Sequence, residues 1–143
     1  MKNSALDIIK GSVLTLVTDQ FNCERIILAS KELAESIDKQ LYVLNISTPK
    51  TNGCDRDHSA LEHLFRVSKE NDAVMLVQYS EHPSREITKY IENMEPSAVI
   101  TGIPSTQNSV LHKLWIRFPT TSFYLTDADG LLNKVSVMDR IIG

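Results

Sequence analysis

The sequence lacks the patterns that define several common protein classes. Its 143 residues include only two cysteines, Cys23 and Cys54, with no CxxC spacing and no clustered histidines between them. Structural zinc sites and disulfide frameworks depend on such spacing, so neither is expected. We interpret both cysteines as incidental thiols.

Long apolar runs are also absent. The longest, such as 13–17, have the length of a strand, whereas a membrane-spanning helix needs about 18 or more apolar residues. The segment 1–12 lacks the basic start, apolar run and small-residue cleavage site of a secretory signal. We therefore expect a cytoplasmic protein with no membrane insertion.

The motifs of the familiar nucleotide-dependent and hydrolytic enzymes are missing as well. There is no GxxxxGK[ST], no GxSxG, and no GxGxxG after the first apolar run, where 18–22 contains no glycine. No carboxylate pair stands beside a histidine at a predicted strand end. P-loop and classical dinucleotide folds are excluded, and we predict that the chain is not an enzyme. The four histidines fall on different predicted helical elements: His58, His63, His82 and His112.

What is present is typical of one soluble globular domain spanning 1–143. The chain is 42% hydrophobic and 23% charged, and its net charge of −3 comes from scattered acidic and basic residues. Because no basic patch could follow a phosphate backbone, we expect no nucleic-acid partner.

Five short β-branched, apolar runs alternate with helical periodicity. Such runs are typical of strands buried on both faces of a parallel sheet, and the alternation predicts βαβ units with right-handed crossovers. The fold class is therefore α/β, a Rossmann-like five-stranded parallel sheet with helices on both faces. The strands are expected at 12–18, 40–46, 73–77, 98–101 and 121–125, and the helices at 22–37, 57–68, 83–94 and around 111–118.

The end of the chain carries a further turn signal. Residues 127–130 read Asp-Ala-Asp-Gly, and 132–137 alternates like an exposed strand. This pattern favours a C-terminal hairpin after the fifth strand.

Ligands of such sheets bind at the carboxyl ends of the strands, where the strand order reverses. The loops that start at Thr18 and at Thr101 flank that crevice if the first and fourth strands are central. The polar loop 102–109 leads into a helix, so Ser105 or Asn108 either caps that helix or helps its N-terminus to bind an anion. Asp19 either contacts a ribose hydroxyl or caps the first helix.

Taken together, several segments resemble those of one family. They are 14–18 followed by 23–27, 33–35 leading to 41–46, the run 98–102, and 108–110 followed by Phe118-Pro119. Over nearly the whole chain the pattern resembles the universal stress protein (UspA-like) family, and within it the stress-protein-like domain of KdpD-type sensor histidine kinases. The resemblance implies a parallel sheet of order 3-2-1-4-5, a homodimer, and adenine nucleotide held by some members between strands one and four.

The chain departs from the binding motif of the members that hold ATP. Those members carry Gly-x-x-Gly, a spacer of about nine residues, and Gly-Ser or Gly-Thr. Here Gly102 is followed by only five residues before Asn108-Ser109, so the phosphate loop is shortened and degenerate. The family's aspartate at the end of strand one aligns with Thr18, and Asp19 is displaced by one position.

The leading hypothesis is a non-catalytic stress-response or signalling module that binds an adenine nucleotide weakly, such as ATP, AMP or cyclic di-AMP, and requires no cofactor. The alternatives are a ligand-free dimeric platform for a regulatory protein partner and, less favoured, a nucleotide hydrolase. The candidate nucleotide-binding residues are Thr18, Asp19, Ile46, Gly102, Ser105, Thr106, Asn108 and Ser109.

Overall fold

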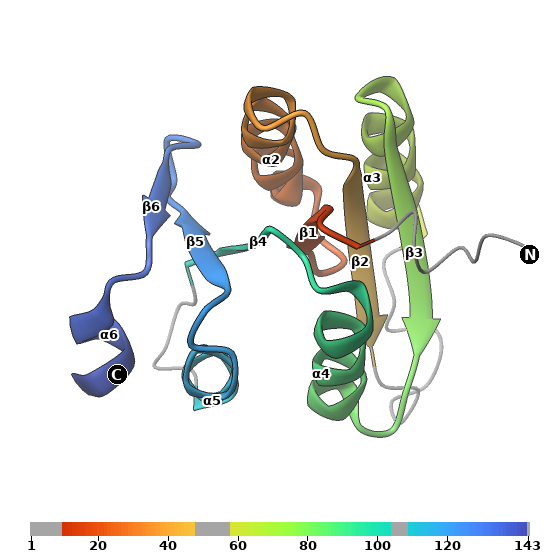
Figure 1. Ribbon diagram of the computed structural model, residues 1–143. Helices are drawn as coiled ribbons and strands as arrows, with labels where there is room; N and C mark the ends of the chain where they lie inside the picture. The colour runs from red at the N-terminus through yellow and green to blue at the C-terminus, as the bar shows by residue number, and fades with distance from the viewer. Residues whose placement is uncertain (1–9, 48–57, 104–108, 143) are drawn as a thin grey trace, which may run out of the picture.

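The computed structural model describes residues 10–47, 58–103 and 109–142 (Figure 1). The strands are Val13–Leu16 (β1), Leu41–Ser47 (β2), Ala73–Tyr79 (β3), Ala98–Gly102 (β4), Ser122–Thr126 (β5) and Leu132–Lys134 (β6). The helices are the 3-10 turn Phe21–Cys23 (η1), Glu24–Ser36 (α2), His58–Glu70 (α3), Pro83–Met94 (α4), Ser109–Arg117 (α5) and Val137–Ile142 (α6).

All strands belong to one sheet of order β3-β2-β1-β4-β5-β6. The first five strands are parallel, with β1 between β2 and β4, and β6 pairs antiparallel with β5. The predicted five-stranded parallel sheet of order 3-2-1-4-5 is confirmed, and the predicted hairpin adds a sixth strand to it.

The central strands are apolar because helices cover both faces of the sheet (Figure 1). Successive side chains of a strand point to opposite faces. Val13 accordingly packs into the layer under α2 and α3, and Leu14 into the layer under α4 and α5; both are fully buried. Because neither face of a central strand contacts water, its sequence does not alternate between apolar and polar residues.

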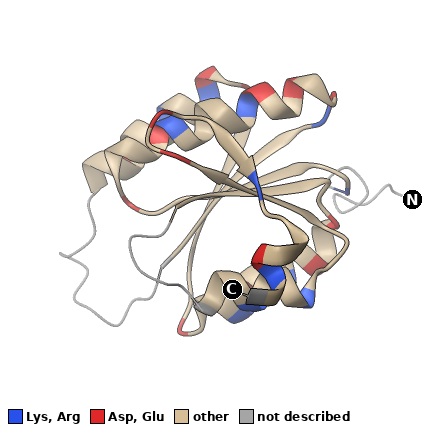
Figure 2. Cartoon of the chain, turned by 90° about the vertical axis from the view of Figure 1, so that its left-hand side faces the viewer, with Lys and Arg blue, Asp and Glu red and all other residues tan. Residues whose placement is uncertain are grey.

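Charged residues lie mainly on the outer surfaces of the helices. Figure 2 shows acidic and basic residues interspersed along the helices on both sides of the sheet. Within the described ranges, no helix combines the length and apolar character needed to cross a membrane.

The end of the chain differs from the sequence-based expectation. The exposed strand expected at 132–137 ends at Lys134, and Val137–Ile142 forms α6. A reciprocal capping box starts this helix: Ser136 N donates to Asp139 Oδ2 at 2.8 Å, and Asp139 N donates to Ser136 Oγ at 3.1 Å. Arg140 then fixes the helix by donating to the carbonyls of Trp115, Phe118 and Thr121 at 2.7–3.0 Å.

Strand β3 forms one edge of the sheet and β6 the other. Val74 and Val77 of β3 are 43% and 47% exposed, whereas Val13 and Leu14 of central β1 are fully buried. Strand β5 is paired on both sides, by β4 and by β6.

Candidate functional site

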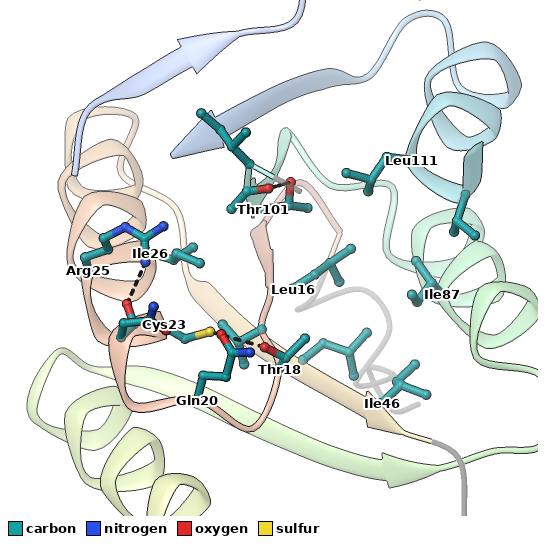
Figure 3. A pocket seen from close by; sticks show the side chains of 16 residues that line it. Leu16, Thr18, Gln20, Cys23, Arg25, Ile26, Ile46, Ile87, Thr101 and Leu111 are labelled. Carbon is teal, nitrogen blue, oxygen red and sulfur yellow. Dashed lines mark hydrogen bonds between the residues drawn. The ribbon is translucent and has the colours of Figure 1, made fainter. Parts of the chain in front are cut away.

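A pocket of about 510 Å³ opens at the carboxyl ends of β1 and β4 (Figure 3). These strands are adjacent at the centre of the sheet, where the strand order reverses, which is where ligands of doubly wound sheets bind. Its volume is within the usual range for small-molecule sites, about 300–1,000 Å³. The lining residues are Leu16, Val17, Thr18, Gln20, Asn22, Cys23, Arg25, Ile26, Leu44, Ile46, Ile87, Thr101, Gly102, Ile103, Val110 and Leu111.

Most of the lining is aliphatic, and it comes from both helical layers. Figure 3 shows Ile26 of α2 on one side of the pocket, with Ile87 of α4 and Leu111 of α5 on the other. A flat apolar group, such as an aromatic base, can be buried between such walls.

Most of the neutral polar groups that line the pocket come from the segment that follows β1, and Thr101 comes from β4. Thr18 Oγ1 lies 3.6 Å from Sγ of Cys23, which is buried in the pocket wall. Gln20 and Asn22 also line the pocket. Thr101 Oγ1 donates to the carbonyl of Gly102 at 3.0 Å. Hydroxyl and amide groups at one rim can fix the orientation of a ligand whose body lies against the apolar walls.

Arg25 is the one charged side chain among the described residues that line the pocket. Its Nη1 donates to the carbonyl of Asn22 at 2.8 Å, and its Nε donates to the carbonyl of Asp127 at 3.0 Å. The second acceptor lies 102 residues away, in the turn between β5 and β6. Two segments of backbone therefore hold one guanidinium at the pocket.

Gly102 allows α2 to approach the end of β4 closely. A Cβ atom at this position would lie 3.0 Å from Cδ1 of Ile26 and 3.9 Å from Nη2 of Arg25. The first distance is shorter than an ordinary van der Waals contact, so glycine at this position lets Ile26 pack against the end of β4.

The structure places three of the predicted site residues, Thr18, Ile46 and Gly102, in the pocket lining. Their binding of nucleotide stays a prediction. Ser105, Thr106 and Asn108 lie outside the described residues, and Ser109 is the first residue of α5. The helix cap predicted at Ser105 or Asn108 also falls on residues that the structure does not describe.

Asp19 follows β1 but does not line the pocket. Its Oδ1 accepts a hydrogen bond of 2.7 Å from Nδ2 of Asn45, and the same amide donates to the carbonyl of Val17 at 3.2 Å. The N-cap positions of η1 and α2 are Gln20 and Cys23, so Asp19 is not the cap residue of the first helix. The hydrogen bond from Asn45 thus ties this carboxylate to β2.

Sequence reasoning missed Arg25 and Asn45. Arg25 stands at the border of the apolar stripe of α2, one residue before buried Ile26, and that position is a usable signal for a cation at the pocket. Asn45 interrupts an otherwise apolar strand, and a buried amide there needs partners.

A smaller depression of about 240 Å³ lies between α4 and α5, and its lining includes three cations, Arg85, Lys113 and Arg117. Within the described ranges, no group of three or more His, Cys, Asp or Glu side chains gathers to hold a metal ion.

No protein-family model and no curated protein matches the chain. Solved structures do match its fold. A universal stress protein in complex with cAMP is 12% identical, with a TM-score of 0.60, and the match covers 82% of this chain and 97% of that one. A universal stress protein from Archaeoglobus fulgidus is 14% identical, with a TM-score of 0.61, covering 86% and 93%.

A further structure, of the universal stress protein from Archaeoglobus fulgidus in complex with dAMP, is 15% identical, with a TM-score of 0.58, covering 87% of this chain and 99% of that one. At such identities the likeness establishes the shared α/β fold.

Proposed function

We propose that this chain is a non-catalytic stress-response or signalling module that binds an adenine nucleotide in the pocket between β1 and β4. The observation that carries the proposal is the position of this pocket, of about 510 Å³, at the reversal of strand order. Two proteins of the same fold have been solved in complex with cAMP and with dAMP.

The lining supports binding rather than turnover. Its described residues include no histidine, aspartate or glutamate, so none of them offers the usual general acid or base. Aliphatic walls with a polar rim suit a purine and its ribose. The shortened loop after Gly102 favours weak binding, and AMP, ATP and cyclic di-AMP are the ligands to compare.

Thermal unfolding with adenosine, AMP, cAMP, ATP and cyclic di-AMP tests the proposal. A ligand that binds only the native state stabilises it by about 2.7 kcal/mol at a concentration 100 times its Kd. We expect a saturable rise in the unfolding midpoint with an adenine nucleotide. Sustained release of phosphate from ATP by the pure protein would contradict the non-catalytic assignment.

A matched pair of variants locates the site. Ile103 lines the pocket and is 51% exposed, so Ile103→Trp fills the pocket without disturbing the core. Ile116 of α5 is 57% exposed and is not among the lining residues, which makes Ile116→Trp the control. Ile103→Trp should abolish the ligand-induced shift and Ile116→Trp should preserve it.

An interaction platform is the second candidate, favoured by the surface of α6. Val137, Met138 and Ile141 are 71%, 59% and 70% exposed on this short helix. Contiguous exposed apolar side chains of this kind mark protein contacts. This candidate predicts a concentration-dependent oligomer, measured by analytical ultracentrifugation, and no response to any nucleotide. These proposals also include a homodimer, a regulatory protein partner, a cytoplasmic location and a closer kinship to KdpD-type domains.

A further inference from the structure

We propose that Arg25 is the anion-recognition residue of the pocket, and that the ligand therefore carries a phosphate or similar anionic group beside an apolar body. The inference rests on the proposed function, because it concerns the same pocket. It deepens that function by naming the group that would contact the phosphate in a chain whose phosphate loop is shortened.

The orientation of Arg25 is fixed before any ligand arrives. The carbonyls of Asn22 and Asp127 accept from Nη1 and Nε at 2.8 and 3.0 Å, so two of the three guanidinium nitrogens are held. No described residue accepts a hydrogen bond from Nη2, which lies 3.9 Å from the Cβ position of Gly102 at the pocket wall. A guanidinium fixed in this way loses little conformational entropy when it binds an anion.

The charge of Arg25 is also only partly balanced, because the carboxylate of Asp127 interacts with it electrostatically but makes no direct ion pair with it. No acidic side chain is among the described lining residues, and Arg25 forms no ion pair with a described residue. The carboxylate of Asp127 instead accepts from the amides of Asp129 and Leu131 and, at 3.4 Å, from Nδ2 of Asn133. A hydrogen bond from this charged donor to an anion is stronger than one between neutral groups.

The hairpin that follows β5 has a part in this arrangement. The carbonyl of Asp127 belongs to the turn between β5 and β6, and the Asp127 side chain closes the same turn. The turn thus positions the guanidinium, although it contributes no residue to the pocket lining.

Affinities for AMP, adenosine and pyrophosphate, measured by isothermal titration calorimetry at constant ionic strength, test the inference. AMP and adenosine differ by the phosphate, and pyrophosphate provides an anion without a base. The variants are Arg25→Gln, which removes the charge, and Arg25→Lys, which keeps the charge but loses the planar fork. Arg85→Gln is the matched control, because Arg85 is an exposed arginine in the depression between α4 and α5.

In the wild type we expect AMP to bind more tightly than adenosine. Arg25→Gln should weaken AMP binding by about tenfold or more and leave adenosine binding unchanged, as is typical of a lost hydrogen bond to a charged group. The affinity of Arg25→Lys for AMP should lie between those of the wild type and Arg25→Gln, and that of Arg85→Gln should match the wild type. Unchanged adenosine binding also shows that the variant pocket is intact. The NMR signal of the Arg25 guanidinium in the wild type should shift with AMP and pyrophosphate but not with adenosine, which tests the inference even if both variants misfold.

Each other outcome is decisive. Equal affinity of the wild type for AMP and adenosine, or wild-type affinity of Arg25→Gln for AMP, overturns the role of Arg25 and leaves the proposed function standing. If no adenine compound binds but pyrophosphate binds in an Arg25-dependent way, the proposed function is wrong and the anion site stands. If neither binds, both fail.

Discussion

The side-chain amide of Asn45 donates a 2.7 Å hydrogen bond to Oδ1 of Asp19, joining β2 to the segment that follows β1. Asn45 is 1% exposed and also donates to the carbonyl of Val17 at 3.2 Å. One buried amide therefore ties down the backbone that leads into η1 and the pocket rim. Removal of this amide breaks both bonds and takes away the side-chain donor to the buried carbonyl of Val17.

We expect Asn45→Ala to lower the free energy of unfolding by about 1–3 kcal/mol, the usual cost of a broken buried hydrogen bond. Urea unfolding followed by circular dichroism measures the change. Asp19→Asn is the control, because its amide oxygen still accepts from Asn45, and its effect should be smaller. Wild-type stability of Asn45→Ala would show that the bond contributes nothing.

Gly102→Ala should destabilise the protein by about 1 kcal/mol or more, as overpacking of a filled wall does. The new Cβ would stand 3.0 Å from Cδ1 of Ile26. Ile26→Val removes that methyl group, at a cost of its own because Ile26 is buried, so Gly102→Ala should cost less in the Ile26→Val background than in the wild type. A double-mutant cycle by chemical denaturation gives the coupling energy, and additive effects of the two changes would argue against the contact.

Arg140→Lys should release α6 from α5. The guanidinium donates to the carbonyls of Trp115, Phe118 and Thr121, and an ammonium cannot reproduce that planar set of bonds. We expect the free energy of local opening of α6, measured by amide hydrogen exchange, to fall by about 2 kcal/mol. Arg117→Lys is the control, since Arg117 forms an exposed ion pair with Glu92.

Acid should weaken the turn between β5 and β6. The amide of Leu131, together with that of Asp129, Nδ2 of Asn133 and the charge of Arg25, holds the pKa of Asp127 below its ordinary value of 3.8. Because the folded-state pKa is the lower one, the stabilisation is complete above the unfolded-state value and is lost as the pH falls through the folded-state value.

Urea unfolding between about pH 5 and about pH 2 measures this loss. Asp127→Asn should be less stable than the wild type at the upper end, and the difference between the two should shrink as the pH falls. A constant difference across the range would show that the Asp127 carboxylate does not contribute.

The parallel sheet could be predicted because each central strand is buried on both faces, and runs such as 13–17 therefore carry no polar alternation. The site could be predicted only in part. Thr18 follows β1 and Gly102 ends β4, and the position of these strand ends follows from the topology. The contact of Arg25 with Asp127, by contrast, joins residues 102 positions apart, which no local pattern reveals. Helix α6 was missed because Ser136 was interpreted only as part of the alternating segment 132–137, and its capping partner Asp139 lies beyond the end of that segment.

The antiparallel strand β6 also determines how this sheet can grow. Since β4 and β6 occupy both sides of β5, the backbone of β5 has no free edge to offer a second molecule. Among the described strands, only β6, with three residues, and β3, with seven, have an unpaired side. Assembly of two copies into one continuous sheet would therefore run through β3 or β6, and pairing through β5 would require the C-terminal hairpin to open first.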